Sequence, residues 1–433
     1  MMNGIASGEE NRSAPAMVLT SGQWFADNSA VELVSSSANN EPSLLLWQDG
    51  REPTAHRQIL RDGTFYSPVY MDRSVWAAMT LPTGVADRGP TANLFSETCD
   101  LIEAYAGICA VEAAALAAWN ATTWFADLLW SPPTLFLHGG DITAAMRLLL
   151  LLSRFTRHGL TIAELTPALF RSLMAAGPTL LLNQPRMSSH FHAMCCASNF
   201  RGLVLPGLGA GVIDLACSKA IFVGTRAQAQ REVGIHLYLP SITRALPPLD
   251  AATQNQIKQH FQPWYLHYRL RNLPAVRQSL LAGGGLESAM GEVGRVLESC
   301  TPDSGQLKLR WTTLLQMQDQ DARAARYWDP LAGMIEVLWP RQHASEKAVT
   351  MKALTALTNT LLRSRGETLE YSPEELGRTL ANEGVIRHRT AAGMVVIFDR
   401  ATVLRLHQLA RSLGVGKKMA KCSDCEETRI PAD

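Results

Sequence analysis

The residues best suited to chemistry lie at positions 133–147, where the sequence reads PTLFLHGGDITAAMR. Four β-favouring or apolar residues lead into Gly139 and Gly140, and the apolar stretch that follows, residues 146–155, is typical of a helix. A strand that ends in glycines and turns into a helix offers free backbone N–H groups and the positive end of the helix dipole. This local arrangement is suited to holding a phosphate group.

The side chains needed for phosphate chemistry are nevertheless missing from this stretch. A working phosphate-binding loop (P-loop) reads G-x-x-x-x-G-K-[ST]. Aligned on Gly139, this chain has Ala144 at the second glycine, Ala145 at the lysine and Met146 at the hydroxyl residue that holds Mg²⁺. Asp141 adds a negative charge where an anion would bind. Only the helix start remains available to a phosphate.

A second stretch, residues 175–184, has the form of a Walker B strand. Its apolar run ends in Asn183 and Gln184, where such strands normally carry Asp and Glu. An amide is a poor substitute for a charged Mg²⁺ ligand, and Gln can orient water but cannot deprotonate it. Alone, each stretch also fits ordinary packing of strands and helices. Their order and their separation by about 40 residues favour a degenerate P-loop domain.

Composition places the chain among ordinary globular proteins. A length of 433 residues predicts two or three domains. The net charge of +1 and the 47% of hydrophobic residues do not by themselves indicate a nucleic-acid-binding or membrane protein. The eight cysteines are scattered, which favours reduced thiols in a cytoplasmic protein. The polar N-terminus lacks a signal core. The apolar stretch 104–130 is interrupted by Glu112, Asn120 and Asp127, so we expect a buried helix and no membrane partner.

The sequence predicts an α/β P-loop NTPase-like core with a mostly parallel sheet, a small N-terminal β domain, a helical region and a C-terminal winged helix. Short β-like runs separated by Asp-Gly turns predict that the N-terminal domain is antiparallel. The expected segments are a disordered tail (1–16), the small β domain (17–90), a helical lead-in (91–130), the core (131–245), a helical lid or connector (246–342), the winged helix (343–415) and a basic, flexible tail (416–433).

The core is expected to contain further buried strands at 219–224 and 234–239. Arg231 precedes the last of these strands. In oligomeric P-loop ATPases an arginine near this place reaches the γ-phosphate held by the neighbouring subunit. Arg231 is therefore the candidate arginine finger, and the alternative is an ordinary arginine at the end of a strand.

The C-terminal region has the pattern of a winged helix. Ser372 and Glu375 form a capping-box signature, and a basic turn precedes the strand 394–398. Between residues 385 and 421 there are eight Lys or Arg against one Asp, a net charge of +7. A localised basic face is typical of phosphate contacts, although a solvated surface or a protein-docking wing remains an alternative. The expected DNA-binding residues are Arg387, Arg389, Arg400, Lys417 and Lys418.

Two groups of residues could bind metal, and we expect metal at neither. Cys422 and Cys425 form a lone CxxC, and a zinc site needs two more ligands that no nearby CxxC or HxxxH supplies. The second group joins two histidines to two adjacent cysteines: His190, His192, Cys195 and Cys196. Roles in the core or in loops are the preferred interpretation of both groups.

Four stretches carry a resemblance to a known family: residues 133–140 (PTLFLHGG), residues 178–185 (PTLLLNQP), the strand before Arg231, and residues 372–398, which comprise SPEELGRTL and the basic wing after it. The chain resembles the helicase-like P-loop (AAA+-type) ATPases of bacterial phages, plasmids and integrative elements, which end in a winged helix and often sit beside a primase. The resemblance covers about residues 90–415. It implies this architecture and an association with DNA.

Three functions follow as hypotheses. The first is a catalytically inactive P-loop ATPase-like protein that binds DNA in the replication or maintenance of a mobile element, needs no cofactor and has no catalytic residue. Its core would dock on an active ATPase, helicase or primase, or self-assemble. The second is a divergent ATPase or helicase subunit that binds ATP and Mg²⁺ weakly through residues 139–143. The third is a winged-helix transcriptional regulator whose core only dimerises.

Overall fold

The structure is a computed structural model that describes residues 16–36, 41–139, 141–184, 189–206, 212–223, 233–239, 245–282, 289–302, 304–327, 329–365, 370–391, 393–416 and 422–428. The chain forms two compact units, Met1–Gln316 (unit 1) and Met317–Asp433 (unit 2), and each is described by itself. The division falls inside helix α10 (Gln306–Tyr327).

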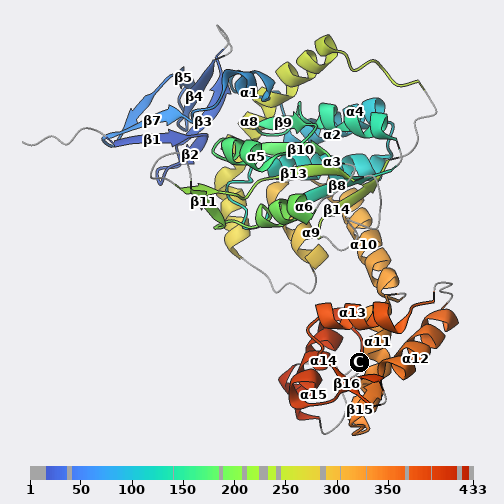
Figure 1. The fold of residues 1–433 in the computed structure, drawn as a ribbon. Helices are drawn as coiled ribbons and strands as arrows, with labels where there is room; N and C mark the ends of the chain where they lie inside the picture. Colours follow the sequence, from blue (N-terminus) through green and yellow to red (C-terminus); the bar gives the residue numbers. More distant parts are fainter. Residues whose placement is uncertain are drawn as a thin grey trace, which may run out of the picture. The chain divides into compact units, whose positions relative to one another are not determined.

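Unit 1 is built around a five-stranded parallel sheet with the strand order β14-β8-β13-β10-β9 (Figure 1). Its strands are β8 (Thr134–His138), β9 (Gly159–Ile162), β10 (Thr179–Asn183), β13 (Lys219–Val223) and β14 (Ile235–Tyr238). The helices between them are α4 (Ile142–Leu152), α5 (Pro167–Met174) and α6 (Ser189–Ala197). The expected α/β core with a parallel sheet is therefore confirmed.

Both faces of this sheet are buried, which explains why its strands are almost continuously apolar. Because side chains alternate across a strand, Leu135 and Leu137 of β8 join the hydrophobic core on one face, which includes α4. Phe136 joins the core on the other face, which includes α5 and α6. The helices on the first face include α2 (Thr91–Ala106), α3 (Ala110–Thr123), α8 (Ala251–Ala282) and α9 (Ala289–Cys300).

The apolar, alanine-rich stretch of the sequence forms α3, whose residues from Ala113 to Thr123 are all buried. Trp124, which follows α3, stacks on Tyr265 of α8 with ring centroids 5.8 Å apart. The prediction of a buried helix is confirmed. None of the helices in the described ranges combines the length and the apolar character needed to cross a membrane.

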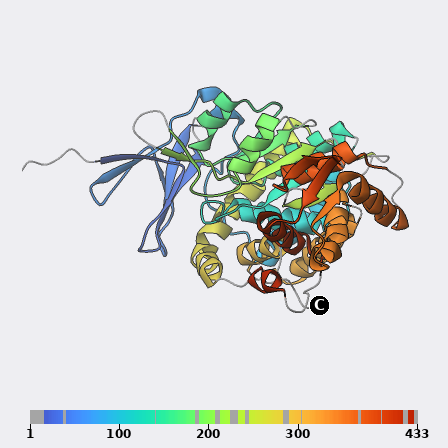
Figure 2. The same cartoon turned by 60° about the horizontal axis from the view of Figure 1, so that its bottom comes forward.

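The N-terminal strands lie at one end of unit 1 (Figures 1 and 2). They form an antiparallel sheet of order β2-β3-β4-β5 and a second sheet of order β1-β7-β6. In the second sheet β1 pairs with β7 in parallel, which differs from the all-antiparallel arrangement expected. The strands are β1 (Ala16–Thr20), β2 (Gly22–Trp24), β3 (Ala30–Ser35), β4 (Pro42–Trp47), β5 (Thr54–His56), β6 (Ile59–Arg61) and β7 (Thr64–Pro68), followed by α1 (Arg73–Ala78).

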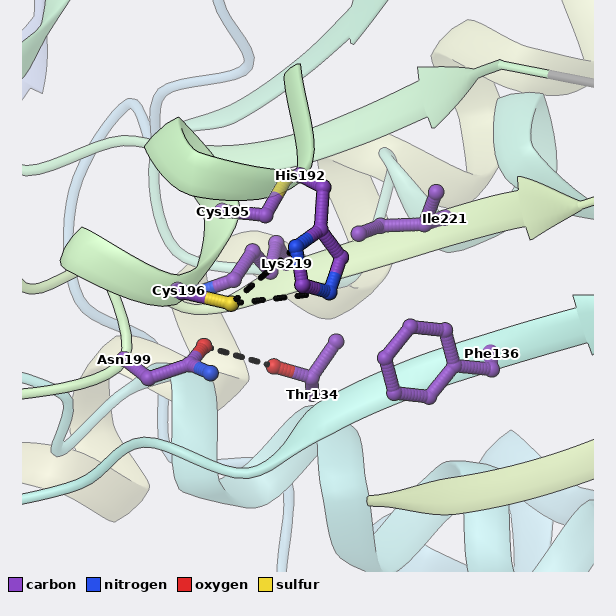
Figure 3. Close-up of a pocket in the computed structure, with 8 residues that line it drawn as sticks. All are labelled: Thr134, Phe136, His192, Cys195, Cys196, Asn199, Lys219 and Ile221. Atoms are coloured by element: carbon purple, nitrogen blue, oxygen red, sulfur yellow. Dashed lines mark hydrogen bonds between the residues drawn. The ribbon is translucent and has the colours of Figure 1, made fainter. Parts of the chain in front are cut away.

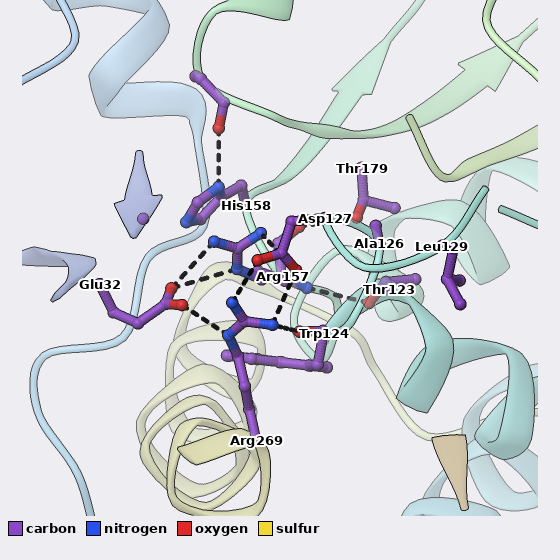
Figure 4. A network of polar contacts seen from close by, with 12 residues as sticks. Glu32, Thr123, Trp124, Ala126, Asp127, Leu129, Arg157, His158, Thr179 and Arg269 are labelled. Atoms are coloured by element: carbon purple, nitrogen blue, oxygen red, sulfur yellow. Dashed lines mark hydrogen bonds and ion pairs between the residues drawn. The ribbon is translucent and has the colours of Figure 1, made fainter. Parts of the chain in front are cut away.

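An ionic network joins the N-terminal sheet to the core, and its residues are buried except for Asp127 (Figure 4). Arg269 Nε donates to Glu32 Oε1 at 2.6 Å, and Arg157 Nη2 donates to Glu32 Oε2 at 3.0 Å. Arg269 also donates to both carboxylate oxygens of Asp127, at 2.9 and 2.6 Å. The network draws its side chains from four parts of unit 1: β3, the segment after α3, the segment after α4, and α8. The β strands are thus part of the same unit as the core.

Unit 2 contains a three-stranded antiparallel sheet of order β15-β17-β16, surrounded by helices. The capping box predicted at Ser372 and Glu375 is present. The elements are α11 (Pro330–His343), β15 (Ala348–Thr350), α12 (Met351–Ser364), α13 (Pro373–Asn382), β16 (Arg387–Thr390), β17 (Gly393–Ile397), α14 (Arg400–Leu413) and α15 (Ser423–Glu427).

Candidate functional site

The carboxyl ends of the parallel strands bring the two degenerate motifs to one edge of the sheet. Gly139 follows β8, and Asn183 ends β10, with β13 between the two strands. The helix that leaves β8 lies on one face of the sheet and α6, which follows β10, on the other. In open α/β sheets, ligands bind at the carboxyl edge where the chain changes face in this way. The motifs therefore occupy the expected place for a ligand.

Asp141 accepts hydrogen bonds from the first backbone N–H groups of the helix that follows β8. Helix α4 begins at Ile142, and the Asp141 carboxylate accepts hydrogen bonds from Thr143 N at 2.9 Å and Ala144 N at 3.1 Å. Ala145 N already donates to Asp141 O at 3.1 Å. Three backbone donors at this helix start are therefore engaged, and a carboxylate occupies the position of the anion. Gly140 lies outside the described residues.

The positions aligned with the P-loop lysine and its neighbours belong to the core. Ala144 and Ala145 are buried, and Met146 packs partly buried against the same hydrophobic core as α4. The next basic residue, Arg147, donates from Nε to Tyr105 O at 2.6 Å and also bonds Pro247 O. Its guanidinium is therefore held by carbonyls away from the loop.

The Walker-B-like positions also lack a charge. The side-chain oxygen of Asn183 is buried and makes no hydrogen bond within the described part of the chain. The backbone N–H of Gln184 donates to Phe222 O at 3.2 Å and continues the sheet beyond β10. Arg231, the candidate arginine finger, lies outside the described residues.

Gly139 is required where it stands. Its φ is +143°, and a Cβ added there would lie 3.0 Å from the carbonyl oxygen of Leu239. We expect Gly139→Ala to lower the free energy of unfolding by about 1–3 kcal/mol, because it combines a strained backbone with a close approach. Gly89→Ala is the matched control, since its φ of +112° is similar but nothing lies within 4 Å of its added Cβ.

Thermal and urea unfolding of both glycine variants would measure the difference. Equal destabilisation would show that backbone strain alone matters and that the approach to Leu239 has no cost.

Three stacked aromatic rings at the end of β8 were not predicted from the sequence. His138 Nε2 lies 3.0 Å from His236 Nδ1, and the His138 ring stacks on the rings of His236 and Tyr238 with centroids 5.3 and 5.0 Å away. The signal was present as alternation in β14, where His236 and Tyr238 share one face. These rings line the carboxyl end of the sheet next to Gly139.

A small pocket lies at the opposite end of β8 and β13 (Figure 3). There His192 contacts the Cys196 thiol, with Sγ 3.7 and 3.8 Å from its ring nitrogens. Lys219 Nζ is buried and donates to Ser198 O at 3.1 Å. The side chain of His190 lies outside the described residues. This pocket adjoins the amino ends of the strands, so it is separate from the P-loop-like segment after β8.

The predicted DNA-binding arginines lie in unit 2. Arg387 and Arg389 are two residues apart on β16, and Arg400 is the first residue of α14. Arg389 and Arg400 are exposed, whereas Arg387 is half-buried. Its guanidinium fills the space beside Gly377 of α13. Lys417 and Lys418 lie outside the described residues.

Known proteins similar to this chain do not identify its family or its function. No family model and no curated protein matches the sequence. Two solved structures, both of the apo C-terminal region of NrS-1, are similar to this chain at 10% and 11% identity. Each covers 85% of this chain and 96% of its own, with TM-scores of 0.35 and 0.33. At this level of similarity neither fold nor function is transferred.

Proposed function

We propose that unit 2 is a winged helix through which this chain binds DNA, and that the P-loop-like core is a scaffold without nucleotide hydrolysis. The role would be the replication or maintenance of a mobile element, as the family resemblance implies. The observation that carries the proposal is the β16–β17 hairpin with its exposed arginine, packed next to a pair of helices.

The order of elements in unit 2 supports the winged-helix arrangement. β15, α12, α13 and the β16–β17 hairpin follow one another, and β17 pairs with both β15 and β16. In helix-turn-helix proteins the second helix of the pair enters the major groove. By analogy we assign α13 to the recognition position and the β16–β17 hairpin to the wing.

The charges favour contacts from the wing and from α14. Arg389, Arg400 and Arg411 are exposed, and no ion pair involves them within the described ranges of unit 2. In contrast, the first turn of α13 carries exposed Glu374 and Glu375. Carboxylates there would repel phosphates, so we assign the backbone contacts to the arginines rather than to the start of α13.

The geometry of the core supports its assignment as a scaffold. Asp141 occupies the donors at the start of α4, and Ala145 is fully buried. Asn183 and Gln184 provide no negative charge for Mg²⁺. At the described positions of the two motifs, no side chain supplies the positive charge or the charged Mg²⁺ ligand that phosphoryl transfer requires.

Removing two arginines from unit 2 tests the proposal. For Arg389→Ala/Arg400→Ala in the full chain, we expect duplex DNA affinity to fall by roughly 10-fold per lost phosphate contact at about 0.1 M salt. The slope of log K against log salt should become shallower by about 2. Fluorescence anisotropy across a salt series would measure both quantities.

Arg73→Ala/Arg171→Ala is the matched control, because it removes the same charge from exposed positions in unit 1. The proposal predicts that this control keeps the affinity and the salt slope of the unaltered chain. An equal loss of DNA affinity in both double variants would show that the effect comes from the change in net charge and not from contacts made by unit 2. Absence of DNA binding by the unaltered chain would overturn the proposal.

A further inference from the structure

Two histidines and two cysteines that are far apart in the sequence converge in unit 2. His343 ends α11, His407 lies within α14, and Cys422 and Cys425 belong to the start and interior of α15. Their potential ligand atoms all lie within 4.8 Å of one another. α11, α14 and α15 are drawn side by side in Figure 1. The lone CxxC of the sequence thus acquires the two further ligands that its local sequence does not supply.

The distances fit a tetrahedral ion. Cys422 Sγ lies 3.4 Å from His407 Nε2, and Cys425 Sγ lies 3.4 Å from His343 Nε2. With Zn–S of about 2.3 Å and Zn–N of about 2.0–2.1 Å, tetrahedral ligation places sulfur and nitrogen ligands roughly 3.5 Å apart. The widest separation in the cluster would close by about 1 Å, which side-chain rotation allows.

Backbone carbonyls fix the tautomer of both imidazoles. His343 Nδ1 lies 2.8 Å from Trp339 O, and His407 Nδ1 lies 2.8 Å from Val403 O. A carbonyl oxygen can only accept, so each Nδ1 carries the hydrogen and donates it. Each Nε2 is then left with a lone pair that faces a thiol. Metal-binding histidines are oriented in this way by a hydrogen bond from the other ring nitrogen.

The surroundings of the cluster are mostly closed to water. Cys425 and His407 are fully buried. The Trp339 ring lies against both imidazoles, with centroids 4.5 Å from His343 and 4.8 Å from His407. The chain passes over this ring at Gly416, where an added Cβ would lie 2.9 Å from it. An indole and two helices therefore restrict access to the four ligand atoms.

From this geometry we infer that His343, His407, Cys422 and Cys425 bind one zinc ion in a structural Cys₂His₂ site. Two thiolates balance the charge of Zn²⁺, and two neutral imidazoles complete four-coordination. Because all four ligands come from the protein, no position remains open for water or substrate, as in structural zinc sites. The ion would fasten α15 to α11 and α14. This goes beyond DNA binding and replaces the expectation that the CxxC binds no metal.

The metal content of the full chain tests the inference. Protein purified from zinc-supplemented medium should contain one zinc per chain by mass spectrometry of the metal. Cys422→Ser and Cys425→Ser should each weaken zinc binding by more than about 100-fold, since even hydrogen-bond partners of ligands contribute 10–100-fold. Cys196→Ser is the matched control, because Cys196 also contacts a histidine but belongs to unit 1. It should keep the zinc.

A second set of measurements begins with the unaltered chain, whose cobalt spectrum does not depend on how any variant folds. Co²⁺ substituted into the unaltered chain should give the visible absorption of a tetrahedral ion and thiolate-to-cobalt charge transfer. Removal of zinc by a chelator should lower the melting temperature of the unaltered chain and leave that of Cys425→Ser unchanged. Zinc-free protein with a Cys422–Cys425 disulfide, an octahedral cobalt spectrum, or zinc lost only from Cys196→Ser would each overturn the inference.

Discussion

Arg269→Met is expected to lower the free energy of unfolding of unit 1 by about 3–5 kcal/mol. The guanidinium is 1% exposed and bonds Glu32, which is 3% exposed, as well as Asp127. It also bonds the carbonyl of Trp124. Removing it leaves Glu32 as a buried carboxylate whose remaining ion pair, within the described ranges, is with Arg157. A buried carboxylate that loses one of its two charge partners is costly, whereas in the intact network both of its oxygens are paired.

Urea denaturation of the full chain, followed by tryptophan fluorescence, would measure this loss. Arg57→Met is the control, because the Arg57–Glu41 ion pair is exposed and its removal should change stability by less than about 1 kcal/mol. Glu32→Gln/Arg269→Met should cost less than the sum of the two single changes, since the pair is removed together. Additive costs would show that Arg269 and Glu32 are not coupled.

The same network makes stability depend on pH. Burial alone raises the pKa of Asp127, but Arg269 and Arg157 outweigh it and hold that pKa well below its ordinary range. The ionised form is therefore favoured in the folded state, so its contribution is full above about pH 4 and is lost as the pH falls towards the folded pKa. The stability difference between the unaltered chain and Arg269→Met should narrow below about pH 4.

No saturable MgATP binding is expected below millimolar nucleotide in calorimetry of the purified chain. The missing lysine contact alone should weaken affinity by roughly 10- to 150-fold, because a charge-assisted hydrogen bond contributes about 1.5–3 kcal/mol. Asp141 weakens it further, since its carboxylate occupies the helix-start donors.

Asp141→Asn distinguishes two effects of Asp141: repulsion of phosphate by its negative charge, and engagement of the backbone N–H groups of α4 by its side-chain oxygen. It removes the negative charge but keeps an oxygen that can cap α4. If the cap itself blocks phosphate, this variant should also show no micromolar binding. Saturable micromolar binding by the unaltered chain would contradict the scaffold assignment, and hydrolysis should then be measured with and without DNA.

The core strands and the helix caps could be predicted from sequence because their signals are local. The apolar runs that became β10 and β13 are short and continuous, as buried parallel strands require. The capping box at Ser372 and Glu375 needs only a spacing of three residues. The basic surface of unit 2 was visible in composition alone, although its contact with DNA remains a prediction.

The remaining features depend on contacts between residues distant in the chain. Glu32 and Arg269 are separated by 237 residues, so no periodicity links them. His343 and His407 likewise show no spacing relationship to Cys422 and Cys425, and only the packing of three helices brings them together. The parallel pairing of β1 with β7 was missed for the same reason. In each case tertiary structure supplied a partner that the local pattern did not contain.

The early start of α4 has a consequence for how this protein could change. Only residues 139–141 separate the end of β8 from Ile142, so the positions aligned with the second glycine and the lysine of the P-loop motif, Ala144 and Ala145, already lie in the first turn of α4. A lysine introduced at Ala145 would enter the first helical turn at a fully buried position. Single substitutions therefore do not lead back to a working phosphate loop. That route requires changes at Ala144, Ala145 and Met146 together, at positions that now belong to a packed helix, which makes the present form difficult to reverse by a single point mutation.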